Sequence, residues 1–239
     1  MIIVIPMSGF GTRFKNIGIT TPKPIIDVKG KWMLDWSLKS LDLSRAGKII
    51  FIIYPEHENE YGISAKLKEK YGEKCVCLFD PSPTGAASTV LVAKQYIDTD
   101  EDIVVKDCDG YIVSHINDTI EKNMDSGIDG ILSTTNMPGD RFSFARLDEN
   151  GYVCEVAEKR RISDHIITGM YYFRHGSDFV KYAEKMIAEN KRVKNEFYIA
   201  PVYEEMIKDG KKIIIDEAEK LWDLGTPETL QYFLENFKD

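Results

Sequence analysis

The 239-residue chain has few cysteines and histidines, and neither type is arranged as a metal site. The cysteines stand at positions 75, 77, 108 and 154 and form no C-x-x-C pair. The histidines, at 57, 115, 165 and 175, show no ligand spacing around them. The pattern argues against a structural zinc centre. Scattered cysteines of this kind are most simply reduced thiols.

Long apolar runs and excess positive charge are also missing. No apolar run approaches the roughly 20 residues that a bilayer span requires, and Met1 leads directly into a strand-like segment without a signal-peptide pattern. The formal net charge is −8, and the dense basic cluster Lys159-Arg160-Arg161 is too short to form a basic stripe. We therefore expect a cytoplasmic protein that binds neither nucleic acid nor a membrane.

Hydrophobic residues make up 43% of the chain, which is enough for a substantial core. The sequence also shows an alternation of strand and helix patterns. Short, continuous apolar runs such as MIIVI and KIIFII are typical of buried parallel strands. We expect strands at 1–5, 48–53, 75–79, 103–106 and 128–134, and helices at 32–43, 59–71, 85–97 and 115–124. This alternation predicts an α/β fold, a Rossmann-like, mostly parallel sheet flanked by helices.

The second half of the chain changes character. FSFARL and YVCEVA are separated by DENG, which predicts a hairpin with a glycine turn. We expect further strands at 167–173 and 212–216, a short strand before Asp223, and helices at 178–189, 199–208 and 227–237. With no linker or repeat, the pattern favours one domain, 1–239, with a small mixed lobe from about residue 136 onward.

Ligands of such sheets bind beyond the carboxyl ends of the strands. The loops expected there are 6–14, 80–85 and 107–110. The first carries Ser8-Gly9-Phe10-Gly11-Thr12-Arg13, in which glycines let backbone N–H groups approach an anion, and Arg13 supplies a charged fork that suits phosphate. A tight turn without a ligand is the alternative. The dinucleotide fingerprint fails because Phe14 stands at the third glycine position, and no P-loop is present.

Lys23 stands between Pro22 and Pro24. Because proline restricts itself and the residue before it, this lysine is held on a stiff segment. Asp107 and Asp109 follow the apolar run IVVK, and two carboxylates at such a strand end suit Mg2+. Two solvated turn aspartates are the alternative.

Together these segments resemble the nucleotidyltransferases that make sugar nucleotides and their phosphocholine-type relatives. The resemblance covers nearly the whole chain in six further motifs: DPSPTG at 80–85, VKDCDG at 105–110, EK at 158–159, TGMY at 168–171, NE at 195–196 and DLGTPE at 223–228. Each motif alone is weak, and their order along the chain makes the resemblance specific. It implies a nucleotide-binding part of about residues 1–135 and an acceptor-binding, metal-completing part of about 136–239.

The resemblance also implies roles for residues. Arg13, Lys23 and Lys159 would be catalytic, and Mg2+ would be held by Asp109 and Asp223. Asp107 is an extra carboxylate where most relatives carry none. The nucleotide would be bound by Met7, Ser8, Gly9, Phe10, Gly11, Thr12, Arg13, Lys23, Asp80, Pro83, Gly85, Ala86 and Asp107, and the acceptor by Lys159, Thr168, Gly169 and Glu196.

The implied reaction is attack of an acceptor phosphate on the α-phosphorus of a nucleoside triphosphate, with release of pyrophosphate. Relatives that use pyrimidines often carry Gln where Asp80 stands, and a carboxylate that only accepts suits the amine of cytosine. Asp80 could equally cap the turn before Pro81. The absence of appended helix repeats also favours cytidylyl transfer. We therefore expect CTP, with dTTP or UTP next.

A sugar phosphate for surface polysaccharide is the expected acceptor, a non-sugar phosphate the alternative, and homo-oligomers occur among relatives. Two other readings remain open. Asp107-Cys108-Asp109 matches the D-x-D of glycosyltransferases that use nucleotide sugars. A nucleotide-binding regulator without catalysis is the second.

Overall fold

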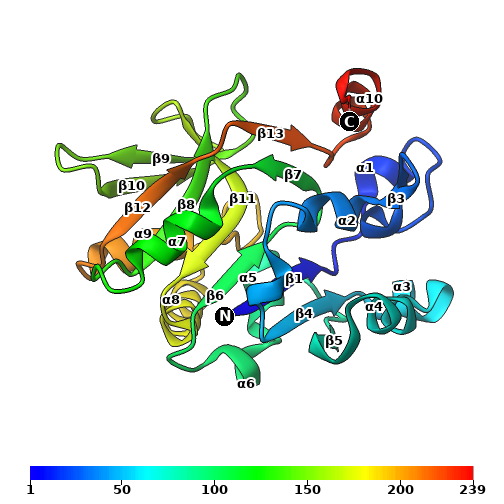
Figure 1. Ribbon diagram of the computed structural model, residues 1–239, viewed down its shortest axis with the longest axis horizontal. Helices are drawn as coiled ribbons and strands as arrows, with labels where there is room; N and C mark the ends of the chain where they lie inside the picture. The colour runs from blue at the N-terminus through cyan, green and yellow to red at the C-terminus, as the bar shows by residue number, and fades with distance from the viewer. Residues whose placement is uncertain (239) are drawn as a thin grey trace.

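The structure is a computed structural model and describes residues 1–238. Within these residues, nine strands form one sheet in the order β10-β9-β11-β6-β1-β4-β5, with β8 pairing to both β11 and β12 (Figure 1). These strands are β1 (Ile2–Met7), β4 (Lys48–Ile53), β5 (Cys75–Phe79), β6 (Ile103–Lys106), β8 (Gly130–Thr135), β9 (Ser143–Leu147), β10 (Val153–Glu158), β11 (His165–Phe173) and β12 (Ile213–Glu217).

The described residues also form two short antiparallel pairs and the helices. The pairs are β2 (Asp27–Val28) with β3 (Lys31–Trp32), and β7 (Gly110–Val113) with β13 (Lys220–Asp223). The α-helices are α1 (Thr12–Lys15), α2 (Met33–Leu38), α3 (Pro55–Tyr61), α4 (Ile63–Tyr71), α5 (Ala86–Leu91), α6 (Lys94–Ile97), α7 (Ile116–Asn123), α8 (Gly176–Ala188), α9 (Ala200–Lys208) and α10 (Pro227–Asn236). The 3-10 helices are η1 (Lys23–Ile25), η2 (Leu43–Arg45) and η3 (Gly72–Lys74).

The central part of the sheet is parallel, as the sequence predicts. Strands β6, β1, β4 and β5 all run in one direction. The change comes at β11, which pairs antiparallel with β6, β8 and β9, and the hairpin β9–β10 lies at that edge. Strands from both halves of the chain thus share one sheet, which is the arrangement expected for the single domain that we propose.

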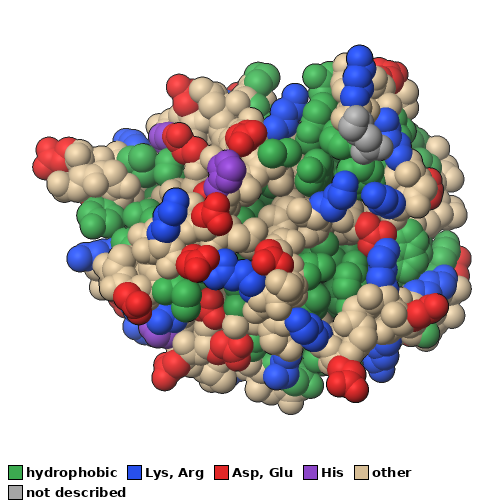
Figure 2. Space-filling view, in the orientation of Figure 1, with side chains coloured by type: hydrophobic (Ala, Val, Ile, Leu, Met, Phe, Trp, Pro, Cys, Tyr) green, Lys and Arg blue, Asp and Glu red, His purple; other side chains and the backbone are tan. Residues whose placement is uncertain are grey.

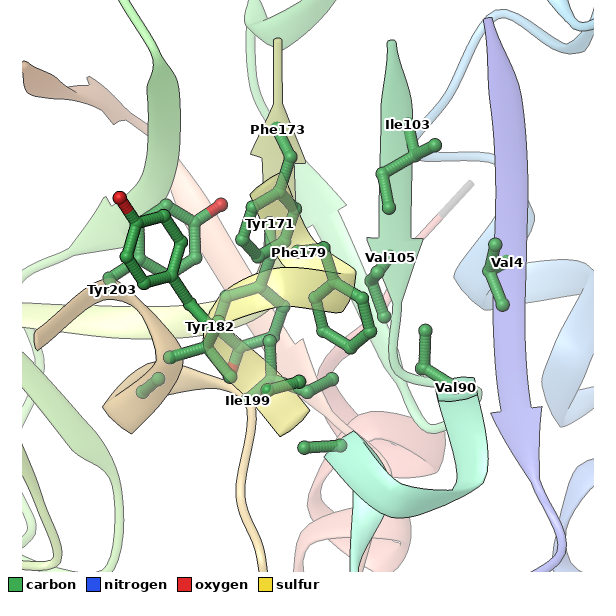
Figure 3. Close-up of a cluster of buried hydrophobic side chains, with 14 of the residues drawn as sticks. Val4, Val90, Ile103, Val105, Tyr171, Phe173, Phe179, Tyr182, Ile199 and Tyr203 are labelled. Atoms are coloured by element: carbon green, nitrogen blue, oxygen red, sulfur yellow. The ribbon is translucent and has the colours of Figure 1, made fainter. Parts of the chain in front are cut away.

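Helices cover both faces of the sheet. Side chains of a strand alternate between its faces, so a continuous apolar strand presents apolar side chains to both helix layers. Ile2 and Val4 of β1 pack in the layer that contains α5, α8 and α9, and Ile3 and Ile5 pack in the layer that contains α2, α4 and α7. Figure 3 shows part of the first layer, in which Val4, Val105 and Tyr171 of the sheet belong to the same buried cluster as Phe179 and Tyr182 of α8. Each buried aliphatic side chain contributes about 1.5–3 kcal/mol relative to its exposed state.

A third apolar cluster joins the beginning and the end of the chain. Phe14 of α1 and Trp36 of α2 pack in it with Leu230 and Phe233 of α10. In Figure 1 the red α10 accordingly lies near the blue α1 and β3. The end of the loop after β1 is therefore fixed by residues from the last helix.

Three predicted helices are shorter than expected. The predicted helix 59–71 is divided into α3 and α4 at Gly62, whose φ of +57° is left-handed. The predicted helix 85–97 is divided into α5 and α6 at Val92 and Ala93, and the predicted helix 32–43 ends at Leu38. The short strand β7, which pairs with the predicted strand before Asp223, was not expected from the sequence.

The visible surface carries both signs of charge, as expected for a chain without a basic stripe. On the face seen in Figure 2, blue Lys and Arg side chains alternate with red Asp and Glu side chains. Of the helices in the described residues, none combines the length and apolar character that crossing a bilayer would need. The four cysteines are free thiols, as expected.

Candidate active site

A cleft of about 500 Å³ lies at the carboxyl ends of β1 and β6. This is the edge where ligands of parallel α/β sheets bind. The loop after β1 forms one wall, and the turn after β6 forms the floor. The lining residues are Pro6, Ser8, Gly9, Phe10, Gly11, Thr12, Arg13, Phe14, Lys23, Pro83, Gly85, Ala86, Thr89, Asp107, Cys108, Asp109, Glu196, Tyr198 and Gly225. Most of the residues expected from the sequence are thereby brought together.

The loop after β1 presents its backbone to the cleft. Gly11 has a φ of +65°, a conformation that glycine adopts without the strain of a Cβ atom, and α1 begins directly after it. Arg13 lies on that short helix and lines the cleft. The side chain of Met7 is 2% exposed and packs in the core, so its expected nucleotide contact would come from its backbone.

Lys23 lies at the start of η1, directly after Pro22. Its Nζ donates to Oδ2 of Asp109 at 2.7 Å. Burial lowers the pKa of Lys23, but the Asp109 carboxylate outweighs it, so the pKa lies above its ordinary value. Conversely, burial raises the pKa of Asp109 and Lys23 lowers it, with a net lowering. The two side chains form a charged pair at the cleft floor.

Asp107 and Asp109 lie in the turn after β6, and both line the cleft. The Asp107 side chain packs on Gly169, where a Cβ atom would lie 2.5 Å from Asp107 Oδ2. The Asp107 N–H also donates to the Gly169 carbonyl at 2.8 Å. Burial, followed by repulsion from Asp109, raises the pKa of Asp107 to about 7. Gly169, expected to bind the acceptor, therefore makes room for Asp107.

Asp109 and Asp223 meet at Gly225. A Cβ atom on Gly225 would lie 2.6 Å from Asp109 Oδ2 and 3.1 Å from Asp223 Oδ1, so both carboxylates border the same point. The N–H of Gly225 donates to Asp223 Oδ1 at 2.8 Å. Burial, followed by the charge of Asp109, raises the pKa of Asp223. Two carboxylates more than 100 residues apart are thus placed side by side.

This pair fits a divalent cation. In proteins Mg2+ is usually bound by one or two carboxylates together with the phosphates of a substrate. Each carboxylate forms an ion pair with a cationic side chain: Asp109 with Lys23, and Asp223 with Arg141. Negative charge at this point is therefore already paired with positive charge. Within residues 1–238, no group of three or more Asp, Glu, His or Cys side chains is arranged to hold a metal. The remaining ligands would have to come from substrate and water.

Lys106 was not singled out from the sequence. Its side chain is 0% exposed, and its Nζ donates to the carbonyls of Asp107 at 2.9 Å and Gly110 at 2.8 Å. An ammonium group is rarely buried unless it is paired. Here it closes the turn that carries Asp107 and Asp109 from beneath.

Of the expected acceptor residues, Glu196 lines the cleft, whereas Lys159, Thr168 and Gly169 are not among the lining residues. The Nζ of Lys159 contacts the hydroxyl of Tyr198 and lies 3.8 Å from the centre of its ring. Glu196 and Tyr198 line the cleft. Thr168 is a correction: its hydroxyl donates to the Ser133 carbonyl at 3.1 Å and its side chain is buried, so it supports the sheet and does not face the cleft.

Asp80 is placed behind the cleft wall. Its Oδ1 accepts from the N–H of Ser82 at 3.0 Å, and its Oδ2 accepts from the hydroxyl of Thr89 at 2.7 Å. The residue is 6% exposed. This is the turn-capping role that the sequence left as an alternative, and contact of Asp80 with the base stays a prediction. Pro83, Gly85 and Ala86 of the same loop do line the cleft.

Comparisons with known proteins agree with this geometry. A family model for nucleotidyl transferases matches residues 2–237. Among curated proteins, the chain is 26% identical over 234 residues to the low-salt glycan biosynthesis nucleotidyltransferase Agl11 of Haloferax volcanii, covering 95% of this chain and 63% of that protein. It is 22% identical over 229 residues to the mannose-1-phosphate guanylyltransferase catalytic subunit beta of Drosophila melanogaster, covering 94% and 59%.

The chain therefore spans less than two thirds of the length of these two relatives. A solved structure, the nucleoside-diphosphate-sugar pyrophosphorylase from Vibrio cholerae RC9, superposes with a TM-score of 0.82 at 26% identity. That comparison covers 98% of this chain and 100% of the other. The likeness thus extends over the whole sheet and both walls of the cleft.

Proposed function

Because the chain belongs to the nucleotidyl transferase family, we propose that it transfers a nucleoside monophosphate from a nucleoside triphosphate to a sugar phosphate and releases pyrophosphate. The observation that carries this proposal is the meeting of the loop after β1, Lys23 and the Asp109–Asp223 pair in one cleft. The names of the two curated relatives and of the solved structure support the same class of reaction.

The proposed chemistry is a displacement between two anions. An oxygen of the acceptor phosphate attacks the α-phosphorus, the bond to the β-phosphate oxygen breaks, and pyrophosphate leaves. Positioning and neutralisation of charge should supply most of the rate. We assign the amides of residues 8–12 and the guanidinium of Arg13 to the β- and γ-phosphates. Lys23 faces the α-phosphate, and Lys159 binds the phosphate of the acceptor.

We also propose that Asp109 and Asp223 hold Mg2+. When bound, the ion would neutralise charge on the α- and β-phosphate oxygens. Lys23 is then shared between Asp109 and the nucleotide, because its Nζ already lies 2.7 Å from that carboxylate. In this scheme Asp107 is a nucleotide-side residue, and burial, followed by repulsion from Asp109, raises the pKa of its carboxyl to about 7.

The base remains a proposal that rests on the sequence. Asp80 has both oxygens engaged with Ser82 and Thr89, so the base contacts should come from Pro83, Gly85 and Ala86. We retain CTP as the donor to test first, beside UTP, dTTP and GTP. An Asp80→Asn variant should keep the wild-type ratio of rates with CTP and UTP. A changed ratio would return Asp80 to the base site.

The test is release of pyrophosphate from purified protein with Mg2+, each of the four nucleotides and a panel of sugar 1-phosphates. Asp223→Asn should lose activity, and Asp209→Asn is its control, because Asp209 pairs with Lys181 and Lys185 away from the cleft. Transfer from a nucleotide sugar without pyrophosphate would favour the D-x-D glycosyltransferase instead. Nucleotide binding without turnover would favour a regulator. A cytoplasmic location, a role in surface polysaccharide and a homo-oligomer also remain proposals.

A further inference from the structure

Residues 192–198, which we name the acceptor strap, connect α8 to α9 along the cleft. The strap turns tightly: Val193 and Glu196 exchange two backbone hydrogen bonds of 3.0 Å, and Lys194 and Asn195 between them have left-handed φ values of +46° and +66°. Asparagine tolerates this conformation, whereas lysine adopts it rarely and where its surroundings enforce it. The strap is therefore a defined element and directs particular side chains.

The strap is fixed to the loop that begins α5. The Phe197 N–H donates to the Thr84 carbonyl, and the Phe197 carbonyl accepts from the Ala87 N–H, both at 2.9 Å. The contact is so close that a Cβ atom on Gly85 would lie 2.3 Å from the Phe197 nitrogen. The Phe197 side chain is buried, with the guanidinium of Arg192 over its ring. The neighbouring side chains of Glu196 and Tyr198 line the cleft.

Tyr198 in turn holds Lys159. The ammonium of Lys159 contacts the Tyr198 hydroxyl and lies 3.8 Å from the ring centre. The backbone of Lys159 is also constrained, with a φ of +54° and an N–H that donates to the Phe142 carbonyl at 2.8 Å. A long lysine side chain loses considerable rotamer entropy when it is fixed in one place. Here the aromatic face supplies a compensating attraction.

Four other charged side chains near Lys159 would attract or repel its ammonium group. Glu158 precedes it on β10, and Glu196 projects from the strap, while Lys194 and Arg13 repel it. A carboxylate partner would neutralise the ammonium that an acceptor phosphate requires. The neutral ring and hydroxyl of Tyr198 hold the ammonium without cancelling its charge.

We propose that Tyr198 is a positioning residue of the acceptor site, which keeps the ammonium of Lys159 oriented for the phosphate of the acceptor. The inference rests on the proposed function in one respect, the assignment of Lys159 to that phosphate. It goes further by giving Tyr198 a specific role toward Lys159. It also connects the acceptor site to the nucleotide loop, since the strap that carries Tyr198 is bonded to Thr84 and Ala87.

The kinetic test uses Tyr198→Leu and Tyr198→Phe with the sugar phosphate that supports turnover. For Tyr198→Leu we expect the KM for the sugar phosphate to rise about tenfold, the scale of one weakened interaction with a charged group. The KM for the nucleotide should stay within about twofold. Tyr198→Phe retains the ring, so its KM for the sugar phosphate should lie between the values of the wild type and Tyr198→Leu. An unchanged acceptor KM in Tyr198→Leu, or an equal rise in both KM values, would overturn the proposal.

The chain offers a matched control. Lys181 and Tyr182 form a similar pair on α8, with Nζ 4.4 Å from the ring centre and 3.1 Å from the hydroxyl. This pair does not line the cleft. Tyr182→Phe should therefore leave both KM values at the wild-type level, which separates an effect on Lys159 from a general loss of a lysine–tyrosine contact.

A second test does not depend on turnover. Lysines are dimethylated with 13C-formaldehyde, and the Lys159 signal is identified by its absence in Lys159→Arg. Because Nζ of Lys159 lies 3.8 Å from the centre of the Tyr198 ring, the ring current should displace its methyl signal in the wild type and in Tyr198→Phe, but not in Tyr198→Leu. In a titration with inorganic phosphate, Tyr198→Leu should need about ten times more phosphate for half-saturation of the Lys159 shift.

The two tests separate the two proposals. If no nucleotide and sugar phosphate support turnover, the proposed reaction fails and the NMR test still decides the role of Tyr198. If the wild-type Lys159 signal is not shifted, or if Tyr198→Leu binds phosphate as the wild type does, the positioning role is refuted while the reaction stands.

Discussion

Gly225→Ala is the sharpest perturbation of the Asp109–Asp223 pair, because it adds a single methyl group between the two carboxylates. The new Cβ atom would lie 2.6 Å from Asp109 Oδ2 and 3.1 Å from Asp223 Oδ1, whereas ordinary van der Waals contacts begin near 3.4 Å. Gly225 has no left-handed φ, so alanine adds no backbone strain. The carboxylates must therefore move apart by at least a few tenths of an ångström.

The magnitude follows from what Asp109 would lose. Its Oδ2, the atom closest to the added methyl group, also accepts the hydrogen bond from Lys23 at 2.7 Å. A hydrogen bond to a charged group contributes about 1.5–3 kcal/mol, and 1.4 kcal/mol corresponds to a factor of ten. We therefore expect kcat/KM for pyrophosphate release to fall by about 10- to 100-fold. The half-saturating Mg2+ concentration should rise.

Gly47→Ala is the matched control. It adds the same methyl group, also without a left-handed φ, and meets only ordinary contacts of 3.8 Å with Glu101 and Met1. Thermal unfolding of both variants shows whether they fold equally well, and Mn2+ binding measured by electron paramagnetic resonance reports on the carboxylate pair without turnover. If Gly225→Ala matches Gly47→Ala in rate, Mg2+ dependence and Mn2+ affinity, the carboxylate pair is not the metal site.

Three further predictions concern single charged side chains. Lys23→Ala and Arg13→Ala should each lower turnover by about 10²–10³-fold, the scale of one preorganised charged donor, and near-normal pyrophosphate release would remove that residue from the mechanism. Lys106→Met removes the lysine donor from the Gly110 carbonyl, while the Asp107 carbonyl keeps the Ser37 hydroxyl as a donor; unfolding in urea should show a loss of about 1–3 kcal/mol, and an unchanged midpoint would contradict this account. Burial raises the pKa of Glu205, but the hydrogen bonds from its lysine partners outweigh burial and bring the pKa down to about 2. The ionised carboxylate therefore stabilises the fold at pH values above its ordinary pKa, and this stabilisation is lost as the pH falls toward 2. Glu205→Gln should consequently be less stable than the wild type at pH 7, with a gap that narrows below pH 4.5 in denaturant unfolding, whereas a constant gap would refute the sign.

The parts of the fold that the sequence predicts are those determined by local patterns. Ile2 to Ile5 form a continuous apolar run, and in the structure they alternate between two helix-covered faces. The hairpin around Gly151 and the strand ending at Asp223 are also found where they were expected. The break at Gly62 was not predicted, because an isolated glycine inside a helical pattern does not show whether it will adopt a left-handed φ.

The candidate site divides in the same way. Gly11, Lys23 and Asp109 stand in short motifs and are found in the cleft. Arg141 carries no motif and reaches Asp223 across 82 positions of sequence, and the buried contacts of Lys106 depend on how the turn after β6 closes. For Asp80 the sequence leaves two roles open, because a carboxylate before a proline suits both a base contact and a turn, and its bonds with Ser82 and Thr89 favour the turn.

The apolar cluster that joins α1 and α10 gives the molecule an internal optical reporter. Trp36 and Trp222, two of the three tryptophans, lie in this cluster, where Phe233 contacts both rings edge-on. Trp222 is also the residue before Asp223. Tryptophan emission should therefore respond when the last helix loosens, and a stopped-flow fluorescence trace can follow the carboxylate end of the cleft in real time without an attached dye.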